Sequence, residues 1–224
     1  MRRQGPEPQD PDPGDTEPGD PEPLPLFPLH TVLFPGGLLP LHVFEERYRL
    51  LVGEGRDFGV VLIRHGREVG PGLGDDVHPV GTVARLRDVE ALPDGSYRVV
   101  ALGLNRFRVQ QLERTRPYLT ARVKRLPDDP TVKARLRLLD LLQRYLGLRG
   151  LQLPEELAAE LRGRPNLRLV WIVGTLLDAE PTKRQRLLEA ADPGLAESML
   201  ASELAKVESL GELGNVPPPP QDRN

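Results

Sequence analysis

The stretch LPLFPLHTVLFPGGLLPLHVFEERYRLLV, residues 24–52, sets the fold of the chain's first half. Pro28, Pro35 and Pro40 separate short apolar runs within it. Proline has no N–H to donate to a β ladder, so these runs suit edge strands and strands that end at turns. Pro35-Gly36-Gly37 is a turn sequence, because its glycines allow positive φ. The stretch therefore predicts short strands joined by a tight turn.

Strand patterns continue from this stretch to residue 126. Residues 57–64, DFGVVLIR, are apolar on both faces, as in a buried strand. Asp94-Gly95 lies between two strand-like runs and is a strong hairpin signal, because a tight primed turn needs positive φ. Residues 118–126 alternate apolar and polar side chains again. Several short strands separated by turns predict a small antiparallel barrel or sandwich over residues 24–126.

Residues 130–213 change to helical periodicity, so a helical bundle is expected to follow the β-rich region. Asp129 and Pro130 form a helix start, and Gly147 is placed to end that helix. Thr182 and Gln185 have the spacing of a capping box. Further helix starts are predicted at Pro154, Pro165 and Asp192-Pro193. One more helix, around Phe44–Val52 within the β-rich region, is predicted from the spacing of Phe44, Tyr48 and Leu51.

The two ends of the chain differ in composition from its middle. Residues 1–23 alternate Pro with Asp, Glu and Gly and hold two arginines against seven acidic residues, a net charge of -5. The whole chain has a net charge of -3, so the remainder has +2. Segments with so few apolar side chains cannot offset the entropy lost on ordering. We therefore predict disordered tails at residues 1–23 and 214–224.

Composition also narrows the function classes. The chain has no Cys, which excludes disulfides and thiolate metal sites. The net charge of the chain after residue 23 is close to zero, so charge alone does not indicate nucleic acid or a membrane as partner. No apolar run is long enough to span a bilayer, and no apolar region follows the N-terminal arginines as in a secretory signal. These features predict a soluble cytoplasmic protein.

Several segments, in this order, resemble the substrate-binding domain at the start of the Lon protease. They are Leu24, Pro25, Pro28 and Leu29; Phe34, Pro35 and Gly36; Leu39, Pro40, Leu41, Val43, Phe44, Glu46 and Arg47; Phe58-Gly59-Val60-Val61; Val80-Gly81-Thr82; Gly103-Leu104-Asn105-Arg106-Phe107; and Lys183, Gln185, Leu187, Leu188 and Glu189. The resemblance covers about residues 24–210. It implies an α+β fold, with a PUA-like β pseudo-barrel before a helical bundle. The cereblon family of substrate receptors shares the Lon-like domain, and this likeness implies a binding function rather than catalysis.

The sequence gives little support for a catalytic site or a metal site. There is no G-x-x-x-x-G-K-[ST] phosphate loop. Ser202 and Lys206 are four residues apart on a predicted helix, but such a pair is common by chance on a surface helix. His30 and His42 flank the Phe34-Pro35 turn without a third obvious ligand, and Asp75-Asp76 suits a solvated turn. We expect no catalytic residues, no metal and no cofactor.

The leading functional hypothesis is a non-catalytic module that binds exposed apolar or unfolded polypeptide segments and can serve a separate protease as an adaptor. The candidate binding residues are Phe34, Leu38 and Leu39, because large apolar side chains around a glycine turn either pack or bind. Their packing against the barrel end or the helices is the competing interpretation.

The alternative function is a PUA-like protein that binds RNA or a small ligand. Its support is a possible basic stripe formed by side chains that alternate along three predicted strands: Arg85, Arg87, Arg106, Arg108, Arg122 and Lys124. Interleaved acidic residues and an aromatic content of only 4% weigh against stacking on bases. Nucleic acid is therefore the less favoured partner, and no membrane partner is expected.

Purified protein is expected to show neither ATP hydrolysis nor ATP-dependent cleavage of casein, because the phosphate loop is missing. Both activities are measured directly, by phosphate release and by gel. A cleavage activity that co-purifies with the protein and disappears in Ser202→Ala would contradict this expectation.

Overall fold

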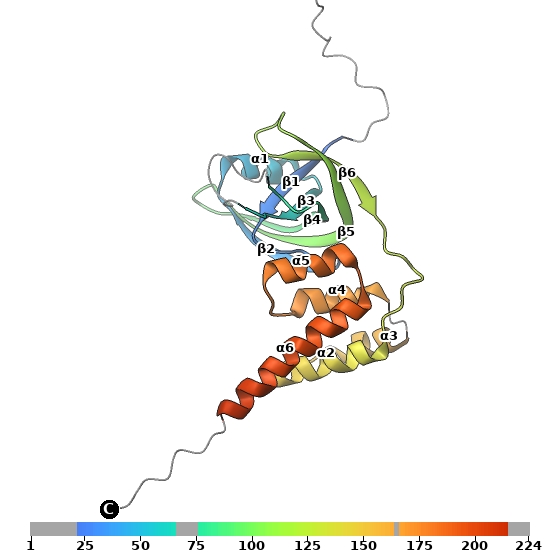
Figure 1. Cartoon of the computed structure of the whole chain (residues 1–224). Helices are drawn as coiled ribbons and strands as arrows, with labels where there is room; N and C mark the ends of the chain where they lie inside the picture. The colour runs from blue at the N-terminus through green and yellow to red at the C-terminus, as the bar shows by residue number, and fades with distance from the viewer. Residues whose placement is uncertain (1–21, 66–75, 164–165, 215–224) are drawn as a thin grey trace, which may run out of the picture.

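The structure is a computed structural model whose described residues are 22–65, 76–163 and 166–214 (Figure 1). Most of the predicted tails at residues 1–23 and 214–224, together with Asp75 and Pro165, lie outside the described residues. A β-barrel occupies one end of the molecule and a group of helices the other, with α5 and α4 directly beneath the barrel. The predicted α+β class is confirmed.

The sheet contains six strands: β1 (Leu24–Leu29), β2 (Leu38–Val43), β3 (Phe58–Leu62), β4 (Val80–Ala91), β5 (Tyr97–Glu113) and β6 (Thr120–Leu126). Their order is β2-β5-β4-β3-β1-β6, and β5 also pairs with β6. That extra pairing closes five strands into a barrel and leaves β2 beside the first half of β5. The predicted Asp94-Gly95 hairpin joins β4 and β5, where Ala91 pairs with Tyr97 and Gly95 has a φ of 80°.

One pairing departs from the predicted antiparallel pattern. β1 runs parallel to β3, with Leu26 opposite Gly59. Parallel neighbours need a long crossover connection. The chain between β1 and β3 supplies it, because it contains both β2 and the helix α1 (Glu46–Glu54).

The helical half contains α2 (Leu136–Leu148), α3 (Glu155–Gly163), α4 (Leu167–Leu176), α5 (Pro181–Ala190) and α6 (Pro193–Gly214). The apolar helix α4 packs against α2, α5 and α6. Asp192 starts α6 as predicted: its carboxylate accepts bonds from the backbone N–H of Gly194 (3.0 Å) and Leu195 (3.2 Å). No helix in the described part of the chain is long and apolar enough to cross a membrane.

The predicted bounds of α2 were wrong at both ends. Asp129 does not cap a helix, because its carboxylate accepts bonds from the N–H (2.8 Å) and hydroxyl (2.6 Å) of Thr131 and closes a local turn instead. These bonds lower the pKa of Asp129. Gly147 lies inside α2, and the chain turns off at Gly150, whose φ is 69°.

Two other predicted helix starts were also misplaced. Phe44 precedes α1, which begins at Glu46 and buries Tyr48, Leu51 and Val52. Thr182 lies within α5 rather than before it, because Pro181 takes the first helical position and Glu180 flanks it. The predicted capping box is therefore absent at this position.

Helix α5 holds the helical half onto the barrel. Gln185 is fully buried, and its amide nitrogen donates to Val80 O on β4 (2.9 Å). In return, Arg106 on β5 donates to Leu188 O at 2.9 Å and lies over the ring of Trp171. Burial lowers the pKa of Arg106. Two segments of the family resemblance, around Arg106 and around Gln185, thus meet at this junction.

Candidate polypeptide-binding surface

The turn at Phe34–Gly37 is held firmly against β5. Gly36 N–H donates to Gly103 O and Gly103 N–H donates to Gly37 O, both at 2.8 Å. Gly37 N–H donates to Phe34 O at 2.9 Å, and Gly36 has a φ of 77°. The glycines therefore serve to make a compact turn rather than a projecting loop.

Phe34, predicted as a polypeptide-binding residue, lies in the core and is 1% exposed. Its ring centroid is 6.1 Å from that of Trp171, and the guanidinium of Arg184 lies 5.7 Å from the Phe34 centroid. The ring rests on the bare backbone of Gly174, where an added Cβ would be 2.4 Å away. Phe34 joins the barrel to the helices, so the packing interpretation describes its position.

Leu38 and Leu39, the other two predicted residues, face opposite sides of β2. Leu39 is half-buried and packs against the barrel core. Leu38 is 52% exposed. The alternation of side chains along a strand explains the difference. Only Leu38 of the three presents an apolar side chain to solvent.

β2 has an open edge that proline partly blocks. No described strand pairs with the side of β2 that faces away from β5. Since Gly103 bonds Gly37 and hydrogen-bonded positions alternate along an antiparallel ladder, the backbone groups of Leu38, Pro40 and His42 point away from β5. Pro40 supplies only a carbonyl there, which limits uncontrolled pairing with other strands.

Exposed apolar side chains continue from β2 into α1. Phe44 is 54% exposed and Leu50 is 49% exposed. A groove of about 520 Å³ between α1 and the β4–β5 turn is lined by Glu46, Arg49, Leu50, Gly53, Glu54, Gly95 and Tyr97. Leu38, Phe44, Leu50 and this groove are called here the β2–α1 surface. Phe44 and Leu50 are not among the predicted binding residues, because both fall within the predicted helix and its spacing places Phe44 on the apolar stripe with Tyr48 and Leu51.

A polar chain supports the end of this surface. His42 Nε2 is 3.0 Å from Ser96 Oγ, and Ser96 Oγ donates to Asp94 Oδ1 at 2.6 Å. The serine proton is thus directed at the carboxylate and not at the imidazole, so His42 does not act as a base on Ser96. These bonds from Ser96 lower the pKa of Asp94. The ring of Phe44 lies 5.8 Å from that of His42, so this chain links Phe44 to the β4–β5 turn.

The remaining predicted candidates are engaged elsewhere. Lys206 Nζ donates to Glu203 at 2.6 Å. The amine is therefore directed at this carboxylate and not at the hydroxyl of Ser202. Within the described ranges, no group of three His, Cys, Asp or Glu side chains is placed to hold a metal ion. Asp76 contacts the ring of His65 at 2.6 Å.

The predicted basic stripe is interrupted. Arg106 is buried at the junction, and Arg85 makes two bonds to Asp57, at 2.9 and 2.8 Å. Arg122 pairs with Glu113 at 3.0 Å. Arg108 and Lys124 do lie opposite one another on β5 and β6. The alternating strand positions therefore do not produce one continuous basic face.

The architecture and this surface define an α+β domain of the Lon N-terminal type. The chain belongs to the family of the ATP-dependent protease La (LON) substrate-binding domain, which it matches over residues 23–204. It is 32% identical to a Lon protease of Methylocella silvestris over 196 residues, covering 78% of this chain and 23% of that protein. It is 41% identical to Lon protease 2 of Myxococcus xanthus over 110 residues, or 47% of this chain and 13% of that protein.

Two solved structures share the fold. The Lon N-terminal domain protein from Xanthomonas campestris has a TM-score of 0.57 and 29% identity, covering 80% of this chain and 97% of the other. The N-terminal domain of the Mycobacterium avium complex Lon protease has a TM-score of 0.54 and 16% identity, covering 82% and 98%. This chain spans less than a quarter of the length of the Lon proteases it matches, so the similarity concerns their substrate-binding part.

Proposed function

We propose that this chain is a non-catalytic recognition module that binds exposed apolar segments of unfolded polypeptides at the β2–α1 surface. It would deliver such clients to a separate protease as an adaptor. The observation that carries the proposal is that Leu38 on β2, Phe44 after it and Leu50 on α1 are exposed, with an open strand edge on β2 and a groove beside α1, in a chain of the Lon substrate-binding family.

The dimensions of the surface suit a short extended segment. Leu38 and Phe44 are six residues apart, which corresponds to about 20 Å along extended chain. A client strand of similar length could contact both side chains. Apolar contacts are non-directional, so such a surface accepts many sequences. The backbone carbonyls on the open edge of β2 add bonds that do not depend on the client's side chains.

Replacing Leu38 by Asp together with Phe44 by Ala is expected to weaken binding of fluorescently labelled unfolded casein by at least about tenfold, or about 1.4 kcal/mol. Both side chains are more than half exposed, so the melting temperature should change little. Binding is measured by fluorescence anisotropy, and folding by circular dichroism.

The matched control is Leu151→Asp, which changes an equally exposed leucine in the helical half. It should leave casein binding intact. Equal weakening by the control would show non-specific apolar contact instead of a defined surface. Measuring binding over a range of salt concentrations distinguishes the proposed function from RNA binding. The affinity for RNA falls steeply with salt through counterion release, whereas the affinity for apolar segments does not.

A further inference from the structure

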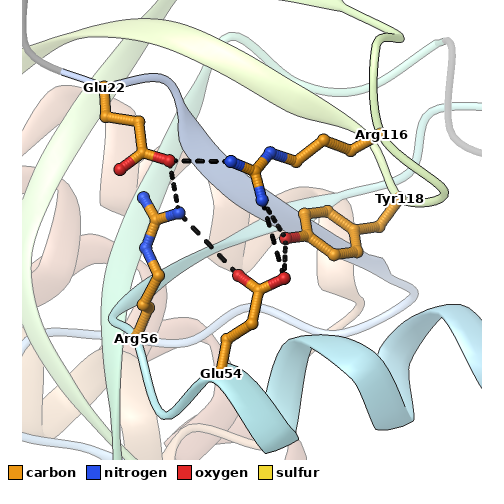
Figure 2. A network of polar contacts seen from close by, with 5 residues as sticks. All are labelled: Glu22, Glu54, Arg56, Arg116 and Tyr118. Carbon is orange, nitrogen blue, oxygen red and sulfur yellow. Dashed lines mark hydrogen bonds and ion pairs between the residues drawn. The ribbon is translucent and has the colours of Figure 1, made fainter.

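An ion-pair network surrounds the point where the described chain begins. Glu22 Oε1 accepts bonds from Arg56 (2.6 Å) and Arg116 (2.9 Å), as Figure 2 shows. The two arginines also approach Glu54 at the end of α1, at 3.8 and 3.6 Å. The hydroxyl of Tyr118 donates to Glu54 at 2.7 Å, and burial raises the pKa of Tyr118. Glu22, an acidic residue of the N-terminal segment, thus forms ion pairs with two guanidinium groups.

A groove of about 370 Å³ adjoins this network. It is lined by Glu22, Leu24, Gln110, Ala121, Arg122, Val123 and Arg125. Arg122 pairs with Glu113, whereas Arg125 makes no ion pair among the described residues. The charge of Arg125 acts on Asp57, but the two short bonds to Asp57 come from Arg85. The groove therefore combines an apolar floor with arginines on its rim.

The positive charge at this end of the barrel is not balanced by the barrel itself. Apart from Glu22, this end of the barrel has five arginines, Arg56, Arg85, Arg116, Arg122 and Arg125, against the three carboxylates of Glu54, Asp57 and Glu113. Glu22 belongs to the acidic N-terminal segment, and it is the only residue of that segment that the structure describes before Pro23. The compensating charge thus comes from the segment that leads into β1.

We propose that the acidic segment Asp10–Asp20 of this chain binds in this groove, against Arg122 and Arg125. Between Asp10 and Asp20 the sequence has five acidic residues and no basic one. Asp20 lies two residues before Glu22 and Glu17 five residues before it, which is about 6 Å and about 16 Å of extended proline-rich chain. Both carboxylates can therefore reach Arg122 and Arg125 from a residue that already lines the groove.

Attachment in the same chain favours this occupant over a free acidic peptide. Exposed ion pairs are individually weak. A short tether, however, gives an effective concentration in the millimolar range, and alternating prolines reduce the entropy lost on binding. The consequence is a surface that excludes other acidic polymers while the segment is in place.

The test uses the full-length chain and a second form in which Asp10, Asp12, Asp15 and Asp20 become Asn and Glu17 becomes Gln. The probe is a fluorescein-labelled synthetic peptide of residues 7–21. The neutralised form is expected to bind the probe at least about tenfold more tightly than the unmodified chain, because no attached competitor remains. The gain should fall steeply between low and high salt.

Two pairs of substitutions in the neutralised form locate the site. Arg122→Gln with Arg125→Gln should remove the gain, and these glutamines keep the stems that cover the apolar floor. Lys133→Gln with Arg135→Gln makes the same charge change at a different pocket, in the helical half, and should keep the gain. Equal probe binding by the unmodified and neutralised chains would overturn the proposal, as would a gain that survives the Arg122 and Arg125 changes.

Discussion

Replacing Phe34 by Ala is expected to lower the free energy of unfolding by about 3–5 kcal/mol, the usual cost of emptying a buried phenylalanine site. The ring is almost fully buried and touches both halves of the molecule. It fills the space above Gly174 and beneath the guanidinium of Arg184, whose pKa burial lowers. Arg184 also donates to Gly174 O (3.0 Å) and Val32 O (3.3 Å). Loss of the ring would leave a cavity next to a partly buried cation.

Urea denaturation followed by circular dichroism measures this change, with Leu38→Ala as the control. Leu38 is only four residues away but half exposed, so its replacement should cost under about 1 kcal/mol. A Phe34→Ala protein of unchanged stability that binds casein more weakly would contradict the structure. It would return Phe34 to the role of a client anchor.

Replacing Gly103 by Ala is expected to cost about 3 kcal/mol, at the upper end of the range for overpacking. A Cβ at this position would lie 2.2 Å from the carbonyl oxygen of Phe34 and 3.1 Å from Leu33 Cγ. The obstacle is backbone that is itself bonded to β5, so it cannot move aside as a flexible side chain would. The methyl group would push β5 away from the turn that carries Phe34.

Gly147→Ala is the matched control for this change. Nothing lies within 4 Å of a Cβ at Gly147, which is inside α2. Alanine is the better helix former there, so stability should rise by up to about 1 kcal/mol. Thermal melts of the two variants should shift in opposite directions. A Gly103→Ala melt equal to that of the unmodified chain would mean that β5 and the Phe34 turn are not in contact.

The resemblance to the Lon family identified residues by motif, and the structure shows what several of them do. Gly103 allows β5 to approach the Phe34 turn. Arg106 and Gln185 bond across the junction to Leu188 O and Val80 O. None of these three residues lies on the β2–α1 surface. Their contacts hold β4, β5 and the Phe34 turn together and against the helices, and β2 of the proposed surface pairs with β5.

Local sequence patterns determined much of the architecture. Asp94-Gly95 predicted the hairpin because few residues adopt positive φ in a tight turn. The change of apolar period near residue 130 predicted the step from strands to helices. Each of these features depends on residues that are close together in the sequence. Such local patterns are what a single sequence can predict.

Of the three predicted binding residues, Phe34, Leu38 and Leu39, only Leu38 has a largely exposed side chain. Phe34 and Leu38 are both large and apolar beside the same glycine turn, so composition could not separate them. Tertiary structure separated them, because Gly174 and Trp171 come from a helix more than 130 residues later and cover Phe34 alone. The parallel β1–β3 pair and the pairing of β6 with β1 were likewise decided by distant partners. Burial is a property of two surfaces, and the sequence near one of them does not specify the other.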